Sequence, residues 1–409
     1  MPATPAPPTR PRPRRLLTAL LATTVVAGLA TACSSGSGGG TSSDPIELGA
    51  IATLSGPATF PESTAAAKAY FDKVNAAGGI GGRKIEYTVV DDAGDGGRAA
   101  QAARQLVDKD GVVALVGSAS VPDCATNAEF YARSSIASVP GAGVLPQCFS
   151  SPNIAPTNTG LFAGLGVSLV HAVKDLGKTK PCVLSGEDVQ AGVAPVLAAF
   201  TRQTGVQVTL AQQYPTDNSN WQSYLLRAQQ AGCDVFVPAV AGPQLVALEK
   251  QITQLGLRGS MTFMELASAY NTQVAAAIQP GADGLVVNSE FLPFTGSGAQ
   301  DPALSDYVST MKGAGVALNS FGQGGYVSAA VLVEVLKGIE GDITAESVLK
   351  ALQTMQPYET PLMGNPYVFG NGKTHQANVS SRFVELRGTD WEPVTTEWTT
   401  LQTGSQSGS

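Results

Sequence analysis

The chain has 409 residues, more than one hydrophobic core usually supports, so we expect two domains. Hydrophobic residues make up 43% and charged residues 14% of a glycine-rich composition, which is typical of a globular protein and not of a disordered or collagen-like one. The formal net charge of −7, with no basic cluster after residue 15, argues against a nucleic-acid-binding protein.

The N-terminal segment 1–33 has the pattern of a targeting sequence, and we exclude it from the fold. A group of arginines precedes the apolar run Leu16–Leu29, which is short for a membrane span. The residues from Leu29 to Cys33 resemble the lipobox of bacterial lipoproteins, in which the cysteine is acylated after cleavage. The alternative is an ordinary signal peptide cleaved near Ala32. The Ser/Gly-rich segment 34–44 is typical of a flexible tether and favours lipidation of Cys33.

From Ile46 the chain alternates short apolar runs with longer segments of helical periodicity. We expect strands at 46–53, 85–90, 112–116 and 136–139, and helices at 63–77, 97–108 and 123–134. Gly78 and Gly79 follow the first of these helices, where glycine supplies the left-handed residue that ends a helix. This alternation indicates a parallel sheet covered by helices.

The alternation restarts after the polar stretch 150–159. Here we expect helices at 162–176, 191–204, 221–231 and 244–255, and strands at 182–184, 206–211, 235–240, 261–263 and 284–288. Late helices are expected at 301–313, 325–338 and 344–353, and late strands near 382–386 and 393–398. These late elements are too few for a third domain, so we expect them to complete the first two. The sequence therefore predicts an α/β protein with two lobes and a chain that crosses between them more than once.

The cysteines that remain after Cys33 are an even set, which in an exported protein indicates disulfides. The order of the elements favours the pairs Cys124–Cys148 and Cys182–Cys233, one in each predicted lobe. Cys182 and Cys233 begin strands that a β-α-β arrangement can place side by side. Cys124 opens a helix and Cys148 follows the next strand.

Patterns of catalytic or metal-binding residues are few. His171 and His375 are the only histidines, and His171 lies in a predicted helix, where a packed or solvated residue is the better interpretation. Asp91 and Asp92 end a strand without further ligands at suitable spacing, so we expect them to cap a turn. The segment 370–374 resembles the end of a phosphate-binding loop but lacks its upstream glycine and its strand-to-helix context. The sequence therefore predicts neither an enzyme nor a resident metal or cofactor.

Small polar or glycine-rich segments follow several predicted strands, at the carboxyl edge where open parallel sheets bind ligands. Ser118 and Ser120 lie between a strand and a helix, and the N–H groups at a helix N-terminus suit a carboxylate. Gly141, Ala142 and Gly143 follow the next strand and offer backbone donors without bulky side chains. The alternative is that the serines only cap the helix and the glycines only turn the chain.

Three motifs carry a family resemblance: Leu54–Pro57, the segment Val74–Ile85 with its run of glycines, and Asp91–Asp95. Together they resemble the leucine/isoleucine/valine-binding proteins, the type I periplasmic binding proteins of branched-chain amino-acid ABC importers. The resemblance runs from about Ile46 to about Trp398. It implies two α/β lobes that close on a ligand around a hinge of three crossovers. Lobe 1 would comprise residues 45–161 and 291–370, and lobe 2 residues 162–290 and 371–401.

The resemblance also implies ligand-contacting positions. Members of the family hold the ligand α-carboxylate with a serine after the third strand, which Ser120 matches, and with a segment whose threonine is missing here. They hold the ammonium group with a glutamate that follows a Gly-Leu pair, and Glu265 lies eight residues after Leu257. An aromatic residue near the ligand side chain is matched by Phe60. The positions that we expect to contact the ligand are Phe60, Ser118, Ser120, Gly141, Ala142, Gly143, Gln190, Glu265 and Gln323.

Two tyrosines of the family pattern are absent, near Ala241 and near Gln190, which leaves the identity of the ligand open. We expect a monomeric, lipid-anchored solute-binding protein on the outer face of the cytoplasmic membrane. It would capture an amino-acid-type solute and deliver it to the permease subunits of an ABC importer. The alternatives are a receptor for an amide, urea or aromatic acid, or a sensor subunit of the same fold.

Replacing Cys33 with serine should release the protein from the membrane with its fold intact, because the acylated cysteine would be the sole attachment. Detergent phase partitioning of the wild-type protein and the Cys33→Ser variant measures this directly. Equal partitioning of the two proteins into the detergent phase would contradict the predicted anchor.

Overall fold

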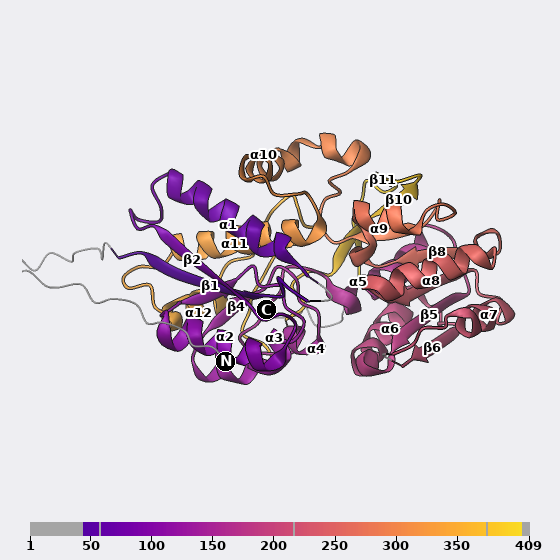
Figure 1. Ribbon diagram of the computed structural model, residues 1–409, viewed down its shortest axis with the longest axis horizontal. Coiled ribbons are helices and arrows are strands. Elements are labelled where there is room, and N and C mark those ends of the chain that lie inside the picture. Colours follow the sequence, from indigo (N-terminus) through magenta and orange to yellow (C-terminus); the bar gives the residue numbers. More distant parts are fainter. Residues whose placement is uncertain (1–43, 57–58, 216, 374, 403–409) are drawn as a thin grey trace, which may run out of the picture. The chain divides into compact units, whose positions relative to one another are not determined.

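Two mostly parallel sheets, each flanked by helices, organise the residues that the structure describes (Figure 1). The structure is a computed structural model, and it describes residues 44–56, 59–215, 217–373 and 375–402. The predicted targeting segment and the lipidation site Cys33 lie outside these residues. The α/β class predicted from the sequence, with a parallel-rich sheet in each half, is confirmed.

The first sheet has four parallel strands in the order β2-β1-β3-β4. They are β1 (Ile46–Ala52), β2 (Ile85–Asp91), β3 (Ala114–Val116) and β4 (Ala137–Val139). Leu48 and Ile51 of β1 are fully buried and belong to different hydrophobic clusters, so this strand is covered on both faces. A strand buried on both faces reads as a nearly continuous apolar run, which is how the sequence revealed it.

The second sheet has eight strands, with the path β11-β10-β9-β8-β7-β5-β6 and β12 beside β10. They are β5 (Pro181–Gly186), β6 (Leu210–Tyr214), β7 (Val235–Ala239), β8 (Thr262–Glu265), β9 (Val286–Ser289), β10 (Ser380–Arg387), β11 (Asp390–Pro393) and β12 (Thr399–Thr400). The late strand β10 pairs with β9 and β11 and runs antiparallel to both. The C-terminal segment therefore completes a sheet that the middle of the chain begins, as the sequence predicted.

Helices connect the strands and cover the sheets (Figure 1). They are α1 (Pro61–Ala76), α2 (Gly96–Arg104), α3 (Asp123–Arg133), α4 (Pro146–Phe149), α5 (Gly160–Lys174), α6 (Gln190–Thr204), α7 (Gln222–Gln230), α8 (Gly242–Gln254), α9 (Thr272–Ile278), α10 (Ser305–Ala314), α11 (Ser320–Lys337) and α12 (Ala345–Gln353). Several begin at polar caps that the sequence supplies: Asp95 accepts from the N–H of Arg98, and Asn319 from that of Gly322. The short helices α4 and α9 were not predicted.

Two predicted strands lie elsewhere in the structure. The strand expected at 206–211 is β6 (Leu210–Tyr214), because the Thr204 hydroxyl accepts from the N–H of Val206 and holds the start of this stretch in a turn. The strand expected at 393–398 ends at Pro393, and β11 begins at Asp390 after a tight turn at Gly388, whose φ is +61°. A proline has no N–H to donate to a ladder, which agrees with the end of pairing there.

Three segments carry the chain between the two sheets: one between β4 and α5, one after β9, and one before β10. Buried Glu290 joins all three. Its carboxylate accepts from the Thr159 hydroxyl at 2.7 Å and the Gly160 N–H at 3.0 Å, and its carbonyl accepts from the Asn378 amide at 2.9 Å. Burial raises the pKa of Glu290, and these donors oppose the rise. The three crossovers thus share one hydrogen-bonded centre.

Helix α11 packs against α1 (Figure 1), and glycines of α11 allow a close approach. A β-carbon at Gly325 would overlap the backbone of Ser63, and one at Gly324 would overlap the carbonyl of Gly141. Ser63 also donates through its hydroxyl to the carbonyl of Gly117, at 2.8 Å. Helix α11 is therefore held close to the loops that follow β3 and β4.

The two predicted disulfides are confirmed. Cys124 and Cys148 join α3 to α4 with 5.0 Å between their Cα atoms. Cys182 lies in β5 and Cys233 lies two residues before the neighbouring β7, with 5.9 Å between their Cα atoms. Both separations are ordinary for a disulfide.

Replacing Gly325 with alanine should lower the free energy of unfolding by about 1–3 kcal/mol, or prevent folding, because the added methyl group meets backbone that cannot move aside. The matched control is Gly313→Ala in α10, where an added β-carbon meets no described atom within 4 Å. That change should stabilise the protein by about 0.5–1 kcal/mol. Chemical unfolding of both variants measures the difference, and equal stabilities would contradict the packing described for α1 and α11.

Candidate functional site

The predicted ligand-contacting residues of the first sheet gather at its carboxyl edge. Parallel bridges from Ala52 to Ala119 and from Ala119 to Ala142 extend the sheet past the ends of β1, β3 and β4. Ser118 and Ser120 therefore lie beside the segment 141–143, as the strand order predicts. All of these residues are buried.

The backbone donors of this segment already have acceptors within the protein. The N–H groups of Gly141 and Ala142 donate to the carbonyl of Ser118 at 3.0 and 3.3 Å. The N–H of Gly143 donates to the side-chain oxygen of Asn158 at 2.8 Å. A ligand carboxylate would have to replace these acceptors. The glycines serve close packing, since a β-carbon at Gly141 would overlap the Ser63 hydroxyl.

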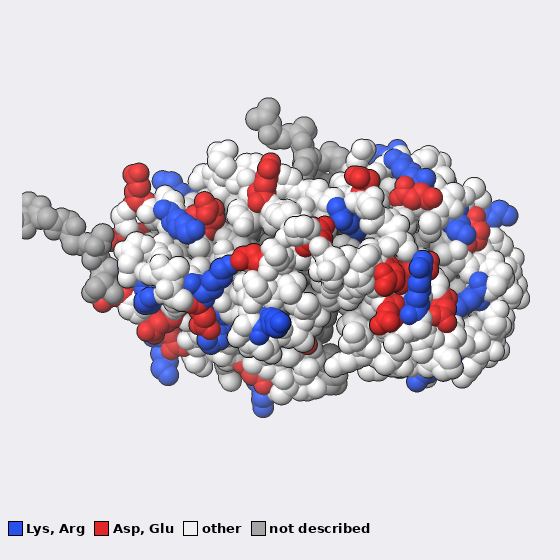
Figure 2. All heavy atoms as spheres, turned by 90° about the horizontal axis from the view of Figure 1, so that it is seen from above, with Lys and Arg blue, Asp and Glu red and all other residues white. Residues whose placement is uncertain are grey.

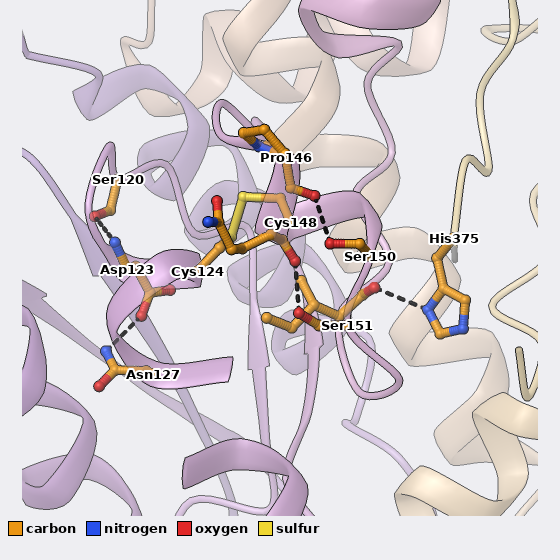
Figure 3. The surroundings of a disulfide bond; sticks show 12 residues. Ser120, Asp123, Cys124, Asn127, Pro146, Cys148, Ser150, Ser151 and His375 are labelled. Carbon is orange, nitrogen blue, oxygen red and sulfur yellow. Dashed lines mark hydrogen bonds between the residues drawn. A yellow bond between two sulfur atoms is a disulfide. The ribbon is translucent and has the colours of Figure 1, made fainter. Parts of the chain in front are cut away.

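The hydroxyl of Ser120 is also engaged. It donates to Asp92 and accepts from the N–H of Asp123, the first residue of α3, at 3.0 Å (Figure 3). Asp92 is fully buried and accepts further hydrogen bonds from the Thr53 hydroxyl at 2.8 Å and the Gly94 N–H at 2.9 Å. A hydroxyl has one hydrogen to donate, so Ser120 can donate to a ligand carboxylate only by leaving Asp92.

Asp91 organises the loop next to this edge. Its carboxylate accepts from the hydroxyl of Ser55 at 2.6 Å and from the N–H groups of Leu54 and Ala93, each at 2.9 Å. These donors, the Ser55 hydroxyl first, lower the pKa of Asp91 to about 2. The sequence-based expectation that Asp91 and Asp92 cap a turn is confirmed. Among the described residues there is no cluster of three or more His, Cys, Asp or Glu suited to a metal.

Phe60 joins the same edge, because its N–H donates to the carbonyl of Thr53 at 2.9 Å. Its ring meets the ring of Phe321 in α11 edge to face, with 5.2 Å between centroids. Phe321 was not predicted, because the helix was expected to begin at residue 325, whereas α11 begins at Ser320. Gln323, two residues after Phe321, is fully buried and donates to the carbonyl of Leu292 at 2.7 Å. It therefore fastens α11 to the crossover segment that follows β9.

On the second sheet, Gln190 follows β5 and Glu265 ends β8, and β7 lies between these two strands. Gln190 begins α6 after β5, is partly exposed, and accepts from the Ser185 hydroxyl at 3.3 Å. Glu265 is the last residue of β8 and has no exposed surface. Within the described part of the chain, no residue donates a hydrogen bond of normal geometry to either of its carboxyl oxygens.

Glu249 and Arg258 surround Glu265, and neither was predicted. Glu249 of α8 is as completely buried as Glu265 and forms an ion pair with Arg258. Burial raises the pKa of Glu265 well above its ordinary value, and the neighbouring Glu249 carboxyl raises it further. No local motif marks Glu249, because it comes near Glu265 through the turn Leu257–Gly259, which carries Arg258 and contacts both α8 and β8.

Comparison with known proteins agrees with this architecture. Residues 45–390 match a family described as periplasmic binding protein. The chain belongs to the periplasmic binding protein family. This membership supports the expectation of a binding function outside the cytoplasm and not of an enzyme.

Two curated relatives of this periplasmic binding protein are distant but span most of its length. The Leu/Ile/Val-binding protein homolog 7 of Brucella abortus is 23% identical over 380 residues, covering 87% of this chain and 91% of that protein. The leucine-, isoleucine-, valine-, threonine- and alanine-binding protein of Pseudomonas aeruginosa is 23% identical over 321 residues, covering 75% and 83%. The family resemblance identified from the sequence motifs is confirmed.

A solved structure shows the same fold. It is the solute-binding protein of an ABC transporter from R. palustris, in complex with 4-hydroxybenzoate. Its TM-score is 0.73 at 15% sequence identity, and the match covers 89% of this chain and all 100% of that one. At this identity the match establishes the fold of this binding protein and does not identify its ligand.

The two histidines serve packing in this binding protein. His171 is buried, stacks on Phe383 with 3.8 Å between ring centroids and bonds to Asp175 at 2.7 Å, which confirms its interpretation as a packed residue. His375 lies near the disulfide between α3 and α4, and its ring nitrogen Nδ1 bonds to the carbonyl of Ile154 at 2.8 Å (Figure 3). Burial lowers the pKa of both imidazoles.

The surface offers two cavities away from the predicted site. One of about 450 Å³ adjoins the end of α5, and another of about 390 Å³ lies between α1 and α10; no predicted ligand-contacting residue lines either. On the face in Figure 2, Lys and Arg side chains alternate with Asp and Glu. No helix among the described residues is long and apolar enough to cross a membrane.

Replacing Ser120 with alanine should lower the free energy of unfolding by about 1–2 kcal/mol, because Asp92 loses a buried donor and the first N–H of α3 loses its acceptor. Ser223→Ala, at an exposed position in α7, is the matched control and should change stability by less than about 0.5 kcal/mol. Urea unfolding of the two variants provides the comparison. A Ser120→Ala variant as stable as the control would contradict the structural role of this hydroxyl.

Proposed function

We propose that this periplasmic binding protein captures a small amino-acid-type solute for an ABC importer, and that Glu265 holds the ammonium group of that solute. The observation that carries the proposal is the state of Glu265. Its carboxyl ends a strand at the ligand-binding edge of the second sheet, is fully buried, and has no donor of normal geometry among the described residues. A buried carboxylate in that state requires a cation or a proton.

The carboxylate of the solute would meet the edge of the first sheet. Ser120 and the N–H groups of the segment 141–143 are the donors there, and each now bonds to an acceptor of the protein. Ligand binding would break these internal hydrogen bonds and replace them with bonds to the ligand carboxylate. The broken bonds offset part of the binding free energy that the new ones contribute. We therefore expect the contact with Glu265 to contribute more to affinity than the contact with Ser120.

Closure on the ligand would proceed around the three crossover segments. Lobe 1 would comprise residues 45–161 and 291–370, and lobe 2 residues 162–290 and 371–401. A zwitterion that contacts both lobes binds the closed state more tightly than the open one, which is what shifts the equilibrium towards closure. Glu290, which joins the three crossovers, is the centre about which such a motion would turn.

The protein would act at the outer face of the cytoplasmic membrane as a monomer, anchored by acylated Cys33 through the tether 34–44. Its partners would be the permease subunits of the importer, as the ABC-transporter description of the solved R. palustris protein suggests. A sensor subunit of the same fold is the alternative. Uptake of labelled solute by cells with and without the permease subunits of the importer distinguishes the two roles, because only import requires them.

An aromatic acid is the second candidate ligand, and the paired rings of Phe60 and Phe321 favour it. These rings lie next to the edge formed by Thr53 and Ala119, and they can pack against an aromatic ligand. The solved R. palustris protein holds 4-hydroxybenzoate, which has a carboxylate but no ammonium group. Such a ligand would bind while the carboxyl group of Glu265 is protonated and neutral.

A thermal-shift panel on the refolded, ligand-stripped protein tests the proposal. L-leucine, L-alanine, L-threonine, 4-hydroxybenzoate, benzoate and urea are the probes. We expect an amino acid to raise the Tm most, since ligand at 100 times its Kd stabilises by about 2.7 kcal/mol. Glu265→Gln should weaken the binding of that amino acid roughly ten- to hundredfold, and Ser120→Ala should weaken it less.

The matched control for Glu265→Gln is Glu129→Gln, an exposed glutamate of α3, which should leave affinity unchanged. If 4-hydroxybenzoate or benzoate stabilises the protein while every amino acid fails, the aromatic-acid candidate replaces the amino-acid one. An affinity for amino acids that survives Glu265→Gln would refute the assigned role of Glu265.

A further inference from the structure

Glu249 and Glu265 form a buried carboxyl pair beneath the carboxyl edge of the second sheet. Glu249 comes from α8 and Glu265 from the end of β8, and neither residue has exposed surface. Arg258 links the two: it pairs with Glu249, lies over the ring of Phe263 two residues before Glu265, and belongs to the turn Leu257–Gly259, which contacts both α8 and β8. Two ionised carboxylates at close range repel each other, so with one cation between them one carboxyl is expected to keep its proton.

The charges around the pair decide which carboxyl keeps the proton. Arg258 forms an ion pair with Glu249, and its Nε donates to the carbonyl of Gly281 at 2.8 Å, which fixes the guanidinium in place. Burial first, then the nearby Asp188 and Glu265 carboxyls, raise the pKa of Tyr214 in β6 to about 12, and its hydroxyl donates to the carbonyl of Ala239 at 3.0 Å. Among the described residues, Arg258 is therefore the one cation beside the two carboxyls, and it is paired with Glu249.

We propose that Glu249 and Glu265 share one proton in the unliganded protein, with the negative charge on Glu249 beside Arg258, and that the ammonium group of a ligand displaces this proton into solvent. The second half rests on the proposed function, and the first half does not. Glu249 is then a positioning residue: it sets the protonation of Glu265 and does not touch the ligand. Affinity for an amine-bearing solute becomes coupled to pH at a single site.

The direction of the coupling follows from the environment of Glu265. Burial raises its pKa well above the ordinary value and Glu249 raises it further, while Arg258 and the N–H of Leu266 oppose the rise. A raised pKa in the folded state gives stability that is fully present at low pH and is lost as the pH rises through that pKa. Ligand affinity changes in the opposite sense, because at low pH the proton competes with the ammonium group.

A ligand-free titration tests the shared proton. The Tm of the wild-type protein should fall as the pH rises from about 5 to about 8 because of this pair. Glu265→Gln mimics the protonated carboxyl, and Glu249→Gln leaves Arg258 free to neutralise Glu265. Each variant should flatten this fall, whereas Glu129→Gln should keep the wild-type slope. Parallel curves for all four proteins would overturn the shared proton.

If either variant fails to fold, carbon-13 spectra of the wild-type protein labelled in its glutamate carboxyls decide the point. One glutamate carboxyl besides that of Glu290 should titrate well above the ordinary range, and its shift should respond to a second group that titrates with it. Spectra in which every glutamate other than Glu290 titrates in the ordinary range would overturn the shared proton.

Calorimetry with L-leucine tests the displacement. Binding measured in two buffers of different ionisation enthalpy should release a proton to the buffer, and the Kd should rise by up to about tenfold for each pH unit below the pH at which the pair loses it. In Glu249→Gln the proton release and the pH dependence should both disappear. Binding of L-leucine without proton release would overturn the displacement. A flattened Tm curve in the variants together with no binding of L-leucine, L-alanine or L-threonine would uphold the shared proton and refute the proposed function instead.

Discussion

The buried carboxylate of Asp92 holds the carboxyl edge of the first sheet together. It accepts hydrogen bonds from Thr53, Gly94 and Ser120, which belong to the loops after β1, β2 and β3. Because those loops end side by side in a parallel sheet, one carboxylate can satisfy all of them. The start of α3 depends on this arrangement too, since Ser120 both donates to Asp92 and accepts from the first N–H of the helix.

The two sheets present opposite electrostatic situations at their carboxyl edges. Around Asp92 every carboxylate oxygen has donors, and the pKa of the neighbouring Asp91 falls to about 2 with the Ser55 hydroxyl as the main cause. Around Glu265 no donor of normal geometry is present among the described residues, and the pKa rises. A satisfied carboxylate serves the fold, whereas an unsatisfied one retains its capacity to bind a cation or a proton. This contrast is the reason why we propose the ammonium contact on the second sheet.

Much of the fold could be predicted from the sequence, because its signals are local. The apolar run of β1, the glycines after α1 and the position of Cys233 just before β7 each reflect a nearby constraint. The site was less predictable. The bond from Ser120 to Asp92 spans 28 positions, and Glu249 comes near Glu265 only because the turn Leu257–Gly259 contacts both α8 and β8. The prediction of a strand at 206–211 was misplaced because a hydrogen bond to the side-chain hydroxyl of Thr204, and not the apolar periodicity, fixes where β6 begins.

The central claim is that the protein binds its solute through the carboxyl group of Glu265. A crystal structure of the protein with the amino acid that stabilises it most tests this claim most directly. The account predicts the ammonium nitrogen within hydrogen-bond distance of a Glu265 oxygen, about 2.7–3.2 Å, with the Glu249–Arg258 ion pair intact behind it. A bound amino acid whose ammonium group meets other residues, with Glu265 still facing only Glu249, would contradict the account.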